Sequence, residues 1–144
     1  MEPVKLKIQE FDPNNIETGA ICIFIGKRKS GKSYTMRDIL YYKKNYPAVK
    51  LVCPTEKLNE DFSKIIPKIF VEDEFSNDSM KKLFLRQIDI KKQNKKGSNI
   101  DGRIIVIFDD LLASSHLWRK NPYVKKIFMN GRHYNIDFFL SLQV

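Results

Sequence analysis

A stretch of eleven residues contains a phosphate-binding pattern. The segment IGKRKSGKSYT (25–35) places two glycines, a lysine and a serine at the spacing G-x-x-x-x-G-K-[ST]. Glycines allow such a loop to curl, so that successive backbone N–H groups point at a phosphate. Lys32 would neutralise the β- and γ-phosphates of a nucleotide, and the Ser33 hydroxyl would hold Mg²⁺. The residues expected to contact the nucleotide are Gly26, Lys27, Arg28, Lys29, Ser30, Gly31, Lys32, Ser33 and Tyr34.

A second group of candidate residues ends an apolar run. The segment IIVIFDD (104–110) follows the phosphate loop by about 80 residues. An aspartate at the end of a buried strand is typical of the second nucleotide motif, in which it holds the hydration shell of the magnesium ion. Asp109 fits that role, and Asp110 follows where a carboxylate could orient or deprotonate an attacking water. A pair of aspartates can also simply cap a helix, but the upstream loop favours a paired site.

Two polar residues flank the last apolar run, IDFFLSLQ (136–143). Gln143 ends this run, and the carboxyl ends of parallel strands meet at one edge of a sheet. Gln143 should therefore lie near Gly26 and Asp109, either as a sensor of the γ-phosphate and its water or as an ordinary strand end. Arg132 precedes the run, so we expect it at the opposite edge. There it would either reach the nucleotide of a neighbouring subunit in a ring or cap a helix.

The placement of these residues requires strands that alternate with helices. Continuous apolar runs predict strands over residues 20–25, 48–53, 103–108 and 136–143, the first of them buried on both faces. Helical spacing and caps predict helices over 32–44, 56–66, 80–93 and 111–129, the last interrupted before Pro122. The alternation predicts one α/β three-layer domain over residues 1–144 with a mostly parallel sheet. Residues 1–19 are expected to be a polar lead-in with a short strand at Val4–Ile8, and residues 91–102 a basic, mobile and exposed connector.

Composition limits the class of protein. The chain has 144 residues, with 26 Lys and Arg against 17 Asp and Glu. The net charge of +9 favours polyanionic partners unless the lysines are merely solvated.

The cysteines and histidines give no sign of disulfide or metal chemistry. Cys22 and Cys53 lie in apolar runs on non-neighbouring strands, so they should be reduced and unpaired. His116 and His133 have no metal-ligand spacing, which leaves Mg²⁺ as the expected metal. No apolar run approaches the ~20 residues of a membrane span.

These stretches together resemble the DNA-packaging ATPases of nucleocytoplasmic large DNA viruses. That family is the poxvirus/mimivirus-type branch of the FtsK–HerA superfamily of P-loop NTPases. The matching segments are GKRKSGKSYTMRDIL, VKLVCPT, RIIVIFDDLL and KKIFMNGRHYNIDFFLSLQ, so the resemblance runs from about residue 15 to the end. It implies a RecA/ASCE-like ring that hydrolyses ATP with Mg²⁺ to move double-stranded viral DNA into a preformed capsid. Capsid or portal-region proteins would be its partners, in the host cytoplasm (viral factory) or the virion.

The resemblance also implies roles for single residues. Lys32 and Ser33 would bind ATP and Mg²⁺, Asp109 would coordinate the metal, Gln143 would be the sensor, and Arg132 would be the arginine finger. Many members of the superfamily have Asp-Glu where this chain has Asp109 and Asp110.

Members of the family also continue beyond the position of Gln143. Their next strand lies beside the first one, so the resemblance implies that this chain lacks its last strand and exposes an apolar edge. Two other functions remain open from the residues alone. One is a truncated, non-hydrolysing nucleotide-binding or assembly subunit, and the other is a P-loop kinase of small molecules.

Overall fold

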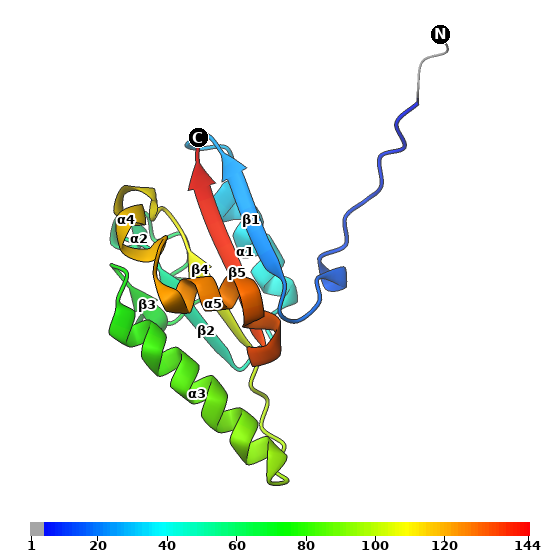
Figure 1. Cartoon of the computed structure of the whole chain (residues 1–144). Helices are drawn as coiled ribbons and strands as arrows, with labels where there is room; N and C mark the ends of the chain where they lie inside the picture. The colour runs from blue at the N-terminus through cyan, green and yellow to red at the C-terminus, as the bar shows by residue number, and fades with distance from the viewer. Residues whose placement is uncertain (1–4) are drawn as a thin grey trace.

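A five-stranded parallel sheet runs through the protein, with helices on both faces (Figure 1). The computed structural model describes residues 5–144. The strands lie in the order β1-β5-β4-β2-β3, and each neighbouring pair is parallel. Their bounds are β1 Ile21–Gly26, β2 Ala48–Val52, β3 Val71–Glu72, β4 Ile104–Phe108 and β5 Ile136–Gln143. The predicted α/β fold is therefore confirmed, whereas β3 was not predicted because two residues carry no periodicity.

The helices divide between the two faces of the sheet. Helix α1 (Lys32–Tyr42) covers one face, and α3 (Asn77–Lys95) and α5 (Pro122–Asn130) cover the other (Figure 1). Asn121 caps α5 by accepting the N–H groups of two residues in its first turn. The short elements are α2 Glu56–Asn59, α4 Ser115–Trp118, η1 Pro13–Asn15, η2 Lys68–Phe70, η3 Leu112–Ser114 and η4 Gly131–Tyr134.

Two helix predictions differ from the structure. The helix expected over 56–66 ends at Asn59, because Glu60 adopts a left-handed φ of 51°. Helix α3 continues to Lys95, so residues 91–95 of the expected connector are helical. The lysines there are good helix formers, and they extend a helix whose packing lies further toward its N-terminus. The short strand expected at Val4–Ile8 begins outside the described residues, and residues 5–8 form no strand.

The sheet separates two apolar cores. Between the sheet and α3 and α5, the ring of Phe108 packs edge-on against Phe138 and Trp118. On the other face, Met36 of α1 packs with Phe139 of β5 in a second cluster of buried residues. Strands β4 and β5 are packed on both faces, and this packing fixes the positions of their carboxyl ends. The predicted site residues lie at these ends.

Strand β1 contradicts the prediction that it is buried on both faces. Among residues 5–144 it pairs only with β5, and the side chains of Ile21, Ile23 and Ile25 are 39, 49 and 64% exposed. Cys22 and Phe24 pack on the α1 side, whereas Figure 1 shows that α5 crosses β5 and leaves most of β1 uncovered. An apolar run indicates a strand of the sheet, but it does not show whether helices cover both faces of that strand. The structure thus shows an exposed apolar edge at β1.

The remaining global predictions concern thiols and membranes. Cys22 and Cys53 are both free, since two strands separate β1 from β2, and the prediction that they form no disulfide is confirmed. Within residues 5–144, every helix is too short or too polar to span a bilayer.

Candidate functional site

The loop between β1 and α1 is tightly curled. Gly31 adopts a φ of +90°, a left-handed conformation that strains any side-chain-bearing residue. A Cβ added to Gly26 would lie 2.5 Å from Ser30 Oγ, so any larger residue at this position would require the Ser30 side chain to move. The N–H of Ser30 donates to the carbonyl of Lys27 (3.2 Å) and closes the turn. The loop leads directly into the N-terminus of α1, whose partial positive charge attracts anions.

The Lys32 ammonium group lies against this loop. Its Nζ donates to the carbonyl oxygens of Gly26 (2.8 Å) and Lys27 (2.7 Å). An ammonium group has three donors, so one remains for a further oxygen acceptor. The loop residues Arg28 and Lys29 add positive charge beside it. The arrangement suits a phosphate group.

Polar side chains from three elements meet at the carboxyl ends of the strands. Ser33 Oγ donates to Asp109 Oδ2 (3.1 Å), which joins the phosphate loop to the residue after β4. The other carboxylate oxygen of Asp109 accepts a hydrogen bond from Ser141 Oγ in β5. Asp109 is 6% exposed, so its carboxylate is fixed by these bonds and screened little by water.

Asp110 follows in an uncommon backbone conformation. Its φ is 56°, in the left-handed region, and its N–H donates to Ser141 Oγ (3.2 Å). Left-handed conformations at residues other than glycine cost free energy and cluster at functional sites. The turn leaves the Asp110 side chain exposed at the cleft described below.

The two ends of β5 place Gln143 and Arg132 far apart. Gln143 pairs in register with Gly26, so it lies beside the phosphate loop. Arg132 belongs to η4, before β5, and is exposed. A Cβ added to Gly19, which precedes β1, would lie 2.6 Å from Arg132 Cα. The structure therefore brings Gln143 to the other candidate residues and leaves Arg132 at the opposite end of the sheet.

A cleft of about 740 Å³ opens over these groups. Its size suits a small-molecule ligand such as a nucleotide. The predicted residues that line it include the loop from Arg28 to Tyr34, Asp109, Asp110 and Gln143. The lining residues that sequence reasoning missed are Arg37, Thr55, Leu58, Asn59, Asp61, Leu112 and Ser141. Ser141 carried a signal, since it is a hydroxyl in an apolar strand two residues before Gln143, whereas the wall at 55–61 matches no motif.

Buried titratable groups lie behind that wall. Burial raises the pKa of the Cys53 thiol to about 11, so Cys53 is no nucleophile at neutral pH. Burial also raises the pKa of Glu56, although its carboxylate accepts the N–H of Phe62 (2.8 Å). That bond ties the turn after α2 to the apolar cluster under α1. Neither Cys53 nor Glu56 lines the cleft.

The oxygen donors present fit a magnesium ion. Mg²⁺ keeps several waters and takes one or two carboxylates plus substrate phosphates, without a dedicated protein cage. Ser33 and Asp109 provide a hydroxyl and a carboxylate in direct contact, at the end of the cleft beside the phosphate loop. No group of three or more His, Cys, Asp or Glu side chains that could hold a metal occurs among residues 5–144. The site thus offers a partial coordination shell that a nucleotide would complete.

Comparison with known sequences finds relatives in large DNA viruses. No family model matches the chain. Uncharacterized protein L437 of Acanthamoeba polyphaga mimivirus is 36% identical over 143 residues, covering 96% of this chain and 50% of L437. Uncharacterized proteins 075L of Invertebrate iridescent virus 6 and 015R of Frog virus 3 are 30% and 28% identical, and the matches cover 55% and 42% of their lengths. The chain therefore spans about half the length of these relatives.

Comparison with solved structures identifies the fold. The pCW3 conjugation coupling protein TcpA, in a monomer form with ATPγS, superposes with a TM-score of 0.53 at 17% sequence identity. The match covers 92% of this chain and 44% of TcpA. At this identity the likeness concerns the fold alone, and that fold is the three-layer α/β architecture of the P-loop ATPases, here with a five-stranded parallel sheet.

Proposed function

We propose that the protein binds ATP with Mg²⁺ in the cleft and hydrolyses it. The observation that carries the proposal is the contact of Ser33 with Asp109 (3.1 Å), because it joins a complete phosphate loop to the aspartate of a second strand end. Two motifs 76 residues apart in the chain thus form one constellation of oxygen donors. The solved TcpA structure, which contains ATPγS in the same fold, supports a nucleotide as the ligand.

Each residue of the cleft has a distinct role in this proposal. Backbone N–H groups of residues 27–33 and the Lys32 ammonium group bind the β- and γ-phosphates. Ser33 and Asp109 would hold Mg²⁺, and the ion would supply positive charge beside the phosphates. Asp110 orients the attacking water and accepts its proton, and Gln143 donates an amide hydrogen bond to the γ-phosphate or that water. Arg132 acts in trans, because it lies at the opposite end of the sheet from the cleft of its own chain.

We further propose that hydrolysis drives the movement of double-stranded viral DNA into capsids. The support is the resemblance to packaging ATPases and the occurrence of relatives in mimivirus and iridescent viruses. A homo-oligomeric ring would place Arg132 of one subunit at the cleft of the next. Capsid or portal-region proteins would hold this ring at the viral factory or the virion.

Substitution of Lys32 tests the nucleotide site. We expect Lys32→Ala to abolish measurable ATP binding and hydrolysis, while Lys64→Ala, which removes an exposed lysine outside the cleft, leaves both unchanged. Hydrolysis that rises with added duplex DNA would support the packaging motor. ATP binding without hydrolysis under any condition would instead identify a nucleotide-binding assembly subunit. Phosphate transfer to a small acceptor without DNA would identify a kinase.

A further inference from the structure

One layer of the fold carries a large excess of positive charge. Residues 81–96 and 111–136 form most of α3 and the layer of α4, α5 and η4. They carry twelve Lys and Arg and a single acidic residue, Asp89. The rest of the chain carries fourteen Lys and Arg against sixteen Asp and Glu. This layer, which we call the basic face, therefore carries a net charge of +11, while residues 27–44 form a second basic segment with seven Lys and Arg against one Asp.

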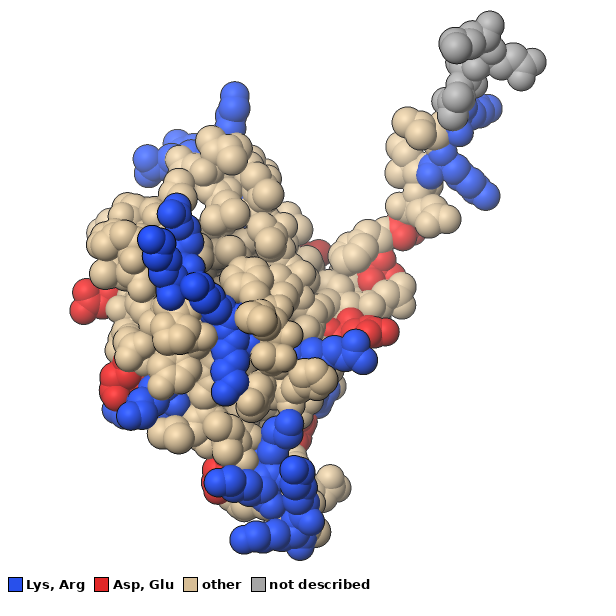
Figure 2. Space-filling view, viewed as in Figure 1, with Lys and Arg blue, Asp and Glu red and all other residues tan. Residues whose placement is uncertain are grey.

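The charges of the basic face are exposed and largely without acidic partners. Figure 2 shows Lys and Arg side chains in a band over α5 and in a cluster at the C-terminal end of α3. Ten of the twelve basic residues are exposed, and Lys91 and Lys126 are half-buried. Within the described part of the chain, only Lys82 of the twelve forms an ion pair, with Asp78. Like charges at this density repel one another, so a polyanionic partner would stabilise the face.

The two half-buried lysines are held in position by aromatic rings. Lys126 Nζ lies 5.1 Å from the centroid of Phe84 and 4.9 Å from that of Tyr134. Lys91 Nζ lies 5.1 Å from the Tyr134 ring and donates to the carbonyl of His133 (2.8 Å). Cation–π contacts of this kind fix an ammonium group without neutralising it. These lysines thus join the charges of α3 to those of α5 across the seam between the helices.

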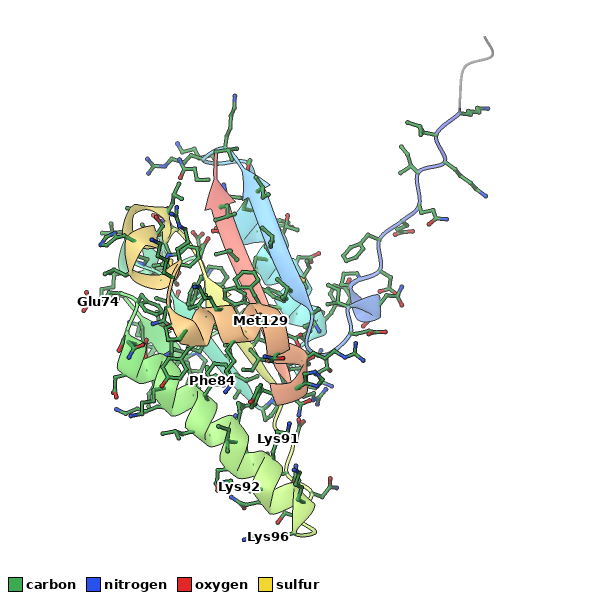
Figure 3. All side chains as sticks on the ribbon, in the orientation of Figure 1. Glu74, Phe84, Lys91, Lys92, Lys96 and Met129 are labelled. Atoms are coloured by element: carbon green, nitrogen blue, oxygen red, sulfur yellow. The ribbon has the colours of Figure 1, made fainter. Side chains whose placement is uncertain are left out.

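We propose that the basic face binds the backbone of double-stranded DNA. The basic residues of α3 extend over about 22 Å at 1.5 Å per residue, and a duplex presents one phosphate per ~1.7 Å of its axis. Proteins that bind single strands stack bases on aromatic rings. Here Phe84 is buried, stacked on Tyr123 and packed edge-on against Tyr134, as Figure 3 shows for its place between α3 and α5. Phe128 of α5 is the exposed phenylalanine of these segments, at 41%. The face therefore offers many phosphate contacts and one exposed phenylalanine ring for a base, which favours binding of a duplex through its backbone, independent of base sequence.

The choice of duplex DNA as the partner rests on the proposed function, but binding by the basic face does not depend on the nucleotide site. The basic face lies on the α3–α5 side of the sheet, whereas the cleft lies at the carboxyl ends of the strands, under the phosphate loop. Duplex binding by the face needs neither ATP nor an intact Lys32. An experiment can therefore disprove duplex binding by the basic face without disproving nucleotide binding in the cleft, and the reverse.

Two matched triple variants test the basic face. One combines Lys92→Glu, Lys95→Glu and Lys125→Glu on the basic face, where Lys92 and the end of α3 are visible in Figure 3. The other combines Lys44→Glu, Lys64→Glu and Lys68→Glu, three exposed lysines outside the basic face. Both change the net charge equally. Fluorescence anisotropy with a random duplex of about 30 base pairs, between about 50 and 200 mM salt, measures affinity and its salt dependence.

We expect the basic-face variant to lose at least about tenfold in affinity, and its salt slope to fall by about 2 to 3. The control variant should change less than about threefold, and both should bind ATP as the unmodified protein does. Equal loss in both variants would overturn the proposal in favour of diffuse attraction, as would unchanged affinity in the basic-face variant. Tighter binding to a single strand or to anionic vesicles than to duplex would overturn it too. If the triple variant does not fold, Lys92→Gln and Lys125→Gln are measured singly instead, and each should weaken duplex binding.

Discussion

The Ser141 hydroxyl contacts both aspartates of the cleft. It donates to the Asp109 carboxylate and accepts the N–H of Asp110 (3.2 Å), so it fixes the turn after β4. Ser141→Ala leaves a buried carboxylate oxygen and an amide without these partners, which costs about 1–3 kcal/mol of the free energy of unfolding. Because the phosphate loop is untouched, we expect kcat for ATP hydrolysis to fall about tenfold or more while KM changes little.

Two measurements separate positioning from a merely structural role for Ser141. Urea unfolding gives the loss of stability, and steady-state hydrolysis gives kcat and KM. Ser98→Ala, an exposed serine in the loop after α3, is the matched control and should change neither. If stability fell while kcat stayed the same, Ser141 would support the fold alone. A rise in KM with an unchanged kcat would mean that it acts on nucleotide binding instead.

At the scale of the elements, a buried ion pair joins α1 to β5. Lys43, just after α1, pairs with Asp137 in β5 (2.8 Å), and both side chains are almost fully buried. Lys43 also donates to the carbonyl of Ile16 (3.1 Å), while Asp137 accepts the N–H of Gly19 (2.6 Å). The pair therefore fixes the amino end of the strand that carries Gln143 relative to the helix that follows the phosphate loop.

We expect Lys43→Ala to lower the free energy of unfolding by about 3–5 kcal/mol, because it leaves Asp137 as an uncompensated buried charge. Lys44→Ala removes the adjacent, exposed lysine and should cost less than about 0.5 kcal/mol. Burial alone would lower the pKa of Lys43, but the hydrogen bond and charge of Asp137 raise it above the ordinary 10.5. Its stabilisation is thus complete below pH 10.5 and is lost as the pH rises through the higher folded value. Equal effects of the two substitutions at pH 7 would rule out this role for the pair.

The elements also show what could be predicted from sequence. The phosphate loop and the Asp109 turn are local patterns, so their strand and helix context followed from a few neighbouring residues. The meeting of Asp109 with Gln143 required only the rule that the carboxyl ends of parallel strands share an edge. The wall of the cleft at residues 55–61 could not be predicted, since it depends on the left-handed turn at Glu60 and on burial of the Glu56 carboxylate.

At the scale of the whole molecule, the proposed nucleotide site and the proposed DNA-binding face lie on different parts of the fold. The cleft lies at the carboxyl ends of the strands. The α3–α5 layer carries twelve Lys and Arg against one Asp, and the phosphate loop with α1 (residues 27–44) carries seven against one. Composition gave the net charge of +9, but only the packing of α3 against α5 gathers the charges of two separate segments into one face. A duplex bound there would lie beside the cleft and not within it, so that it would not block exchange of the proposed nucleotide.

The exposed edge of β1 should make the protein associate with itself. An unpaired strand edge with apolar side chains is a template for pairing with another chain, and inward-facing or edge lysines block such pairing. Ile23 is 49% exposed at the middle of this edge, on the face that α5 leaves uncovered. We expect the molar mass of the unmodified chain to rise with concentration in sedimentation velocity without nucleotide or DNA, and Ile23→Lys to suppress that rise. The control Ile69→Lys changes an isoleucine that is 85% exposed in η2, away from β1, and should leave the association unchanged. Association that persists in Ile23→Lys, or that Ile69→Lys suppresses as strongly, would assign it to another surface.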